Sequence, residues 1–148
     1  MKSKNNIFKL IYSLINNIDD KLYLGIGIGA ISTEKKEVAV GMDGPAFHRA
    51  RKALKKTKKA GKKLYYLENN EQLSKYISII LLLAIDIINN LTVKQLKAIQ
   101  LKQKGLTQQE IADWLNISRT AVTSRLARAD FKTIFHIENL LNQMVFNI

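Results

Sequence analysis

Arginine and hydroxyl side chains share one face of a helix expected over residues 118–129. If Val122 faces the core, a turn of about 100° per residue directs five other positions to solvent. They are Thr120, Thr123, Ser124, Ala127 and Arg128, with Arg119 and Arg125 beside them. Arginine can donate two hydrogen bonds to a guanine edge, and Ser or Thr can contact bases or phosphates. These residue types at this spacing predict a helix that enters the major groove of double-stranded DNA.

Two short helices joined by a tight turn must hold this face in place. Thr107, with Glu110 three residues later, is a capping-box pattern, and Ser118 is a second N-cap residue. Ala112 supplies the small side chain that two helices need where they cross over a short turn. The sequence therefore predicts one helix from Thr107 to Asn116 and another that begins after Ser118.

Residues 106–129, LTQQEIADWLNISRTAVTSRLARA, resemble the helix-turn-helix superfamily in the three-helix form of response regulators and sigma-factor C-terminal regions. The turn carries Asn116 where the family usually has glycine, and asparagine tolerates the left-handed conformation. The resemblance implies phosphate contacts at Thr107 and Gln108. The expected DNA-binding residues are Thr107, Gln108, Ser118, Arg119, Thr120, Thr123, Ser124 and Arg128. The alternative is a helical hairpin that binds protein or binds nothing.

The 148-residue chain has a formal net charge of +12, from 24 Lys and Arg against 12 Asp and Glu. Such an excess favours a polyanionic partner, with nucleic acid ahead of an anionic membrane surface. Nine of the basic residues crowd into Arg49–Lys63, which contains no acid. This run is either a solvated helix face or a second surface that contacts phosphates without reading sequence.

A small α/β part is expected ahead of these helices. Glycine alternates with larger apolar residues along residues 23–31, which is typical of a strand. The glycines at 25, 27 and 29 leave one face of this strand bare for close approach of a helix. Pro45 begins a helix that ends near Ala60, and residues 63–67 form a second strand. A long helix follows over residues 71–89. A helix over residues 7–18 and a short strand at 38–40 are also expected.

The predicted fold class is α+β, predominantly helical. A small α/β part spans residues 1–70, a connecting helix spans 71–91, and a helix-turn-helix domain with a C-terminal helix spans 92–148. The last helix repeats apolar residues in an a/d-like pattern, at Ile134, Ile137, Leu141, Met144 and Ile148. We expect this stripe to pack within the chain, and it is the leading candidate for a homodimer contact suited to paired DNA half-sites.

Residues 22–53 resemble the SatD-like family of small bacterial proteins. The shared features are the glycine-alternating strand and the turn Gly-Met-Asp-Gly-Pro-Ala-Phe at 41–47, which leads into an arginine-bearing helix. Members end in a helix-turn-helix, so the resemblance covers most of the chain. Members also tend to have an upstream part with Gly-Asp motifs, reminiscent of nucleotide-cyclase-like sheets. This chain starts after that part, which implies a shortened relative or a fragment.

The start of the helix at Pro45 offers a second function, a nucleotide- or anion-sensing module derived from a cyclase-like fold, without catalysis. The amides of Ala46, Phe47 and His48 are expected to be unpaired there, with arginines beside them. The residues expected to bind a small anionic ligand are Asp43, Gly44, Arg49 and Arg51. The alternative is that residues 43–45 form only a turn and a helix cap.

Several classes of function are disfavoured by composition. Cysteine is absent, and His48 and His136 lie far apart without metal-ligand spacing, so we expect no metal site. The sequence shows no acid/base pair or nucleophile constellation, so we expect no catalytic residues, no cofactor and no enzyme. The longest apolar run, residues 77–88, is shorter than the roughly 20 residues of a membrane span. The expectation is a cytoplasmic, sequence-specific DNA-binding protein, a bacterial transcriptional regulator, and a basic protein-interaction adaptor is a third possibility.

Overall fold

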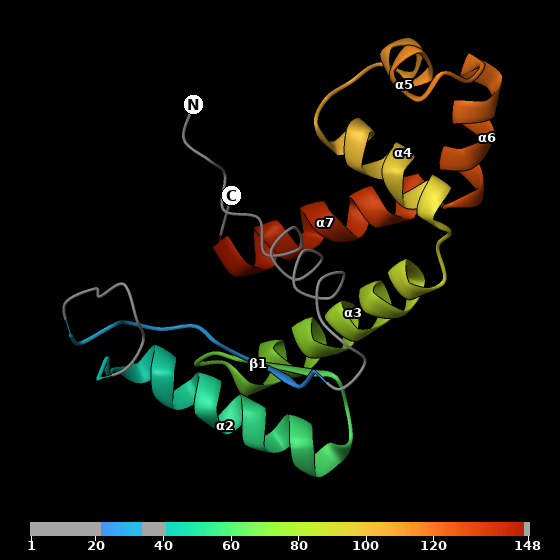
Figure 1. The fold of residues 1–148 in the computed structure, drawn as a ribbon. Coiled ribbons are helices and arrows are strands. Elements are labelled where there is room, and N and C mark those ends of the chain that lie inside the picture. The colour runs from blue at the N-terminus through green and yellow to red at the C-terminus, as the bar shows by residue number, and fades with distance from the viewer. Residues whose placement is uncertain (1–21, 34–40, 147–148) are drawn as a thin grey trace.

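The computed structural model describes residues 22–33 and 41–146, and Figure 1 shows their arrangement. The elements in chain order are β1 (Leu24–Gly27), α2 (Pro45–Ala60), β2 (Leu64–Leu67), α3 (Glu71–Asn89), α4 (Val93–Gln103), α5 (Gln108–Leu115), α6 (Arg119–Arg128) and α7 (Phe131–Phe146). The predicted class, α+β and predominantly helical, is confirmed. The helix expected over residues 7–18 and the strand at 38–40 lie outside the described residues.

The two strands form a parallel sheet in which Leu24 pairs with Leu64, and α2 makes the crossover between them. The predicted close approach of a helix to the bare strand face is confirmed. A Cβ added at Gly27 would lie 2.2 Å from the backbone nitrogen of Ala50, and one added at Gly25 would lie 2.4 Å from that of Leu54. The glycines are therefore required because the α2 backbone occupies the space of their missing side chains.

Serine side chains of α3 complete the outer edge of this sheet. The backbone amide of Tyr66 donates to Ser78 Oγ at 2.9 Å, and that of Glu68 donates to Ser74 Oγ, also at 2.9 Å. Both serines are buried. Because β1 is the only strand of the described residues that pairs with β2, these hydroxyls satisfy amides that β1 leaves without a partner.

Replacing Ser78 with alanine should therefore lower the free energy of unfolding by about 1–3 kcal/mol, since the Tyr66 amide loses its acceptor. The measurement is urea denaturation of the full chain. Ser124→Ala removes an exposed hydroxyl and should change stability by less than about 0.5 kcal/mol. Equal stability of the Ser78→Ala and Ser124→Ala variants would contradict a structural role for this contact.

One continuous hydrophobic core extends from Leu64 on β2 to Leu141 on α7. Helix α3 contributes Ile77 and Leu81 to it and contacts both β2 and α7. This core crosses residues 70 and 91. The predicted division of the chain at these positions stays a prediction. Within residues 22–33 and 41–146, no helix combines the length and hydropathy needed to cross a bilayer.

Helix α7 runs beside α3 and uses its apolar stripe inside the molecule (Figure 1). Ile134 and Leu141 are buried, and Ile137 and Met144 pack against the same core. The expectation that this stripe packs within the chain is confirmed for these four residues, whereas Ile148 lies outside the described part. Ile134 and Leu141 are buried within the chain and so are not free to meet a second copy, and a homodimer contact through the rest of the stripe stays a prediction.

Candidate nucleic-acid interface

Local hydrogen bonds fix the start of α5. Thr107 Oγ1 accepts from the Glu110 amide at 3.2 Å, and the Glu110 carboxylate accepts from the Thr107 amide at 2.7 Å. The predicted capping box is thus confirmed. The hydrogen bonds from Thr107 lower the pKa of Glu110 below its ordinary value. They stabilise the folded state above the ordinary carboxyl pKa, and this contribution is lost as the pH falls through the lowered one.

The turn between α5 and α6 has the predicted conformation. Asn116 adopts the left-handed conformation with φ of 51°, and the Ile117 amide donates to the Ala112 carbonyl at 3.0 Å. Ser118 Oγ then accepts from the Ala121 amide and caps α6. Ala112 is almost fully buried. A small residue at the crossing and an asparagine in the turn therefore let the two helices pack closely.

Helix α6 is divided into a buried and an exposed face. Val122 and Leu126 lie in the core, 0% and 6% exposed. The residues predicted to point outward are all exposed: Thr120, Thr123, Ser124, Ala127 and Arg128. Arg119, predicted to lie beside them, is exposed as well. Arg125 is half-buried at the side of the helix. The prediction of which face of α6 reaches solvent is confirmed.

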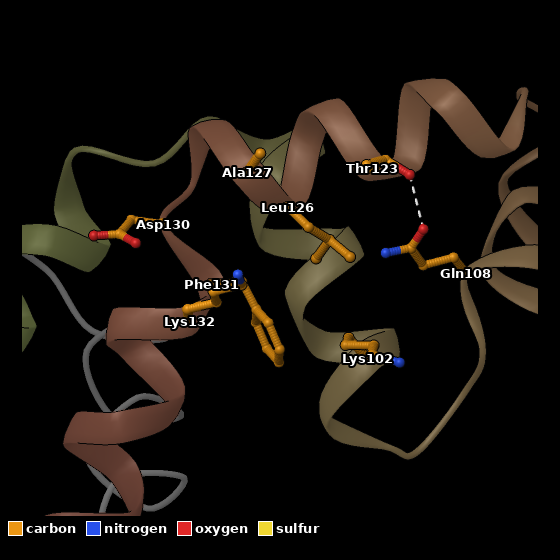
Figure 2. Close-up of a pocket in the computed structure, with 8 residues that line it drawn as sticks. All are labelled: Lys102, Gln108, Thr123, Leu126, Ala127, Asp130, Phe131 and Lys132. Atoms are coloured by element: carbon orange, nitrogen blue, oxygen red, sulfur yellow. Dashed lines mark hydrogen bonds between the residues drawn. The ribbon is translucent and has the colours of Figure 1, made fainter.

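A hydrogen bond links α6 to the start of α5. Thr123 Oγ1 donates to Gln108 Oε1 at 2.7 Å (Figure 2). Within α6, the same oxygen lies 3.0 Å from the carbonyl of Arg119. The Gln108 side chain is therefore held against the exposed face of α6. Thr107 and Ser118 have a structural role as N-caps, so these two predicted contact residues also position the helices that carry the others.

A hollow of about 440 Å³ opens beside the same face of α6 (Figure 2). Its lining comes from the C-terminal half of α4, the starts of α5 and α7 and the side of α6: Lys102, Gln108, Thr123, Leu126, Ala127, Asp130, Phe131 and Lys132. Lys102 Nζ donates to the Leu106 carbonyl at 3.2 Å. The fold thus brings two lysines from separate helices to the edge of the exposed face, and no local sequence pattern identified them.

The motif at residues 41–47 joins β1 to α2. Gly44 is buried with φ of +134°, and a Cβ there would lie 2.7 Å from the Ser32 backbone nitrogen. The Ser32 amide donates to the Asp43 carbonyl at 2.9 Å, and the Ala46 amide donates to the Ala30 carbonyl at 3.2 Å. Through these backbone hydrogen bonds, the motif holds the segment that follows β1 against the start of α2.

The model of the SatD family matches residues 1–145. The chain belongs to the SatD family. No curated protein and no solved structure gives a match.

The structure corrects one expectation about the start of α2 in this SatD-family chain. The Ala46 amide is paired as described, and the His48 amide donates to the Gly44 carbonyl at 3.1 Å. Neither amide is unpaired, because the loop after β1 supplies one acceptor and the first helical hydrogen bond supplies the other.

The residues expected to hold an anion are placed as follows. The Arg49 guanidinium donates to the Ile28 carbonyl and to the Asn69 side chain. His48 Nε2 lies 3.0 Å from Asp43 Oδ1. Arg51 is exposed on α2. Asp43, Gly44 and Arg49 already have partners within the protein, which favours the turn-and-cap interpretation.

The basic run of the SatD-family chain lies on α2, at the opposite end of the molecule from α6 (Figure 1). Its lysines are mostly exposed, and Lys56 Nζ lies 5.2 Å from the centre of the Tyr65 ring. A phosphate-contacting role for this run stays a prediction separate from α6. Among the described residues, no group of three or more His, Asp or Glu side chains is arranged to hold a metal ion.

Proposed function

We propose that this SatD-family protein binds double-stranded DNA sequence-specifically and acts as a bacterial transcriptional regulator, with α6 in the major groove. The observation that carries the proposal is the division of α6. Val122 and Leu126 anchor the helix in the core, while hydroxyl and guanidinium groups line the opposite face. A major groove about 12 Å wide admits a helix, and such side chains can reach its base edges.

The arrangement supplies distinct groups for positioning and for readout. Gln108 accepts a hydrogen bond from Thr123 at the start of α5, and in this proposal it contacts a phosphate beside the groove. Arg119, Thr120 and Ser124 are exposed on α6, and the N-caps of α5 and α6 are other residues. The first turn of α6 contains no acid that would compete with DNA for Arg119. Phosphate contacts then set the register, and α6 reads the bases.

Lys102 and Lys132 extend this proposal to residues that only the fold brings together. Both line the hollow beside Thr123 and Ala127, where a sugar–phosphate backbone would pass if α6 occupies the groove. Lysine contacts phosphates as a point charge and carries no sequence information. These two lysines would therefore add affinity without adding specificity.

Replacing Lys102 and Lys132 together with alanine should weaken binding to all duplexes by a similar factor. The slope of log K against log salt concentration should fall by about 2, since each phosphate contact contributes about 1. Fluorescence anisotropy at several salt concentrations measures this slope. The Lys58→Ala/Lys59→Ala variant removes the same charge from α2 and reports separately on the basic run. An unchanged slope in the Lys102/Lys132 variant would exclude these lysines as phosphate contacts.

Selection of bound sequences from random duplexes, at two salt concentrations, tests the proposed function as a whole. We expect one enriched motif that survives the higher salt concentration, because base contacts depend less on counterion release than phosphate contacts do. Uniform recovery that collapses with salt would leave only electrostatic binding and would contradict sequence-specific recognition. The absence of binding even at low salt would favour a protein-interaction role instead.

A further inference from the structure

Helix α3 carries an apolar stripe that no described part of the chain covers. Tyr76, Ile79 and Leu83 are 52%, 53% and 58% exposed. Their spacing of three and four residues places them on one side of the helix, opposite the buried Ile77 and Leu81. Aligned large apolar side chains of this kind mark interaction surfaces more often than isolated ones do.

We propose that a second copy of this chain docks on this stripe, with the two α3 helices antiparallel across a two-fold axis near Ile79. A two-fold interface uses the same patch on both subunits, so the patch must be complementary to itself. With the axis between positions 79 and 81, Tyr76 faces Leu83 of the second copy, and Lys75 faces Asp86 of the second copy. The pairing rests on α3 alone and stands independently of DNA binding.

The sides of the stripe agree with this pairing. At about 100° per residue, Lys75 and Asp86 lie on one side of Ile79, and Tyr76 and Leu83 lie on the other. In an antiparallel pair of helices related by a two-fold axis, the same side of each helix meets its counterpart. Charged residues therefore meet charged residues of opposite sign, and apolar residues meet apolar residues.

The charges of α3 also allow a second copy of the chain to approach this helix. Asp86 is exposed and has no ion pair among the described residues, and Lys75 has only a 3.9 Å contact with Glu71. Two acids against one lysine make α3 slightly acidic, in a chain whose net charge is +12. Two such helices can approach each other with far less repulsion than two copies of α2, which contains no acid.

Light scattering of the full chain after size-exclusion chromatography tests the pairing. We expect a mass of twice 16.8 kDa for the natural sequence. Ile79→Glu places like charges at the axis and should yield a monomer, while circular dichroism retains the helical signal because the side chain is exposed. A natural sequence that stays monomeric across the micromolar range would overturn the proposal, as would a dimer that survives Ile79→Glu.

Charge reversal tests the predicted ion pair directly. Lys75→Asp and Asp86→Lys should each weaken the dimer, because each creates two like-charge contacts across the axis. The double variant Lys75→Asp/Asp86→Lys restores opposite charges and should recover the dimer. Lys94→Asp, an equal reversal on α4, is the matched control and should leave the mass unchanged. Failure of the double variant to recover dimerisation would refute the antiparallel alignment.

A single introduced cysteine distinguishes the antiparallel from the parallel arrangement, because the chain has no cysteine of its own. Ile79→Cys lies at the axis and should form a disulfide-linked dimer under mild oxidation. Gln72→Cys faces the far end of the other helix and should remain unlinked. Efficient linkage of both variants would indicate a parallel pair and would overturn the proposed alignment.

Discussion

Replacing Gly27 with alanine should destabilise the protein by about 3 kcal/mol, at the upper end of the usual cost of overpacking. The added Cβ would lie 2.2 Å from the Ala50 nitrogen and 2.3 Å from the Ala46 carbonyl oxygen. Both atoms belong to the α2 backbone, so no side-chain rotation can relieve the contact. Helix α2 would have to move away from β1, and a loss of this size is a large part of typical domain stability.

A graded series of alanine variants checks that explanation by urea denaturation. Gly25→Ala meets backbone atoms of α2 at 2.4–2.8 Å and should cost a similar amount. Gly29→Ala meets the Arg49 guanidinium first, and a flexible side chain can move aside, so the cost should be smaller. If Gly27→Ala proves no more destabilising than Gly29→Ala, α2 does not lie as close to the strand as described.

Replacing Arg119 with alanine should cost about 1–3 kcal/mol of binding free energy on the selected DNA sequence, if it makes a bidentate base contact. Arg119 is the first residue of α6, is exposed, and has no acidic neighbour in that turn. On random duplexes the loss should be smaller, because only one charge near the phosphates is removed. Fluorescence anisotropy on both kinds of duplex gives the two losses.

Arg119→Lys is the informative control for this prediction. Lysine keeps the charge but lacks the planar fork of donors that matches a guanine edge. The lysine variant should therefore bind random duplexes as the natural protein does and lose affinity on the selected sequence. If Arg119→Ala loses the same binding free energy on both kinds of duplex, Arg119 contacts a phosphate and not a base.

The helix starts were predictable because their signals are local. Asn70, Thr92, Thr107 and Ser118 each cap a helix through a hydrogen bond to an amide three residues on. Such a contact depends on residue type and spacing within one turn, and both are visible in the sequence. Once Val122 was taken as inward, the exposed face of α6 followed from helical periodicity for the same reason.

Contacts between distant segments were not predictable in this way. Nothing near Ser78 in the sequence indicates that its hydroxyl completes the edge of β2. The partners of Arg49 also come from separate segments, so an arginine expected to be free for an anion is engaged within the protein. The partner of such a side chain depends on which segments pack together in the fold. The same residue type can face solvent in one fold and bond to the backbone in another.

By itself, the sequence determined the order and type of the described elements, the helix caps, the bare face of β1 and the exposed face of α6. The tertiary structure decided that the α7 stripe is buried and that Tyr76, Ile79 and Leu83 of α3 stay exposed. It also placed Lys102 and Lys132 beside α6. The physical reason is that periodicity shows which side of a helix is apolar. Only the packing of the elements shows which apolar sides are buried within one chain.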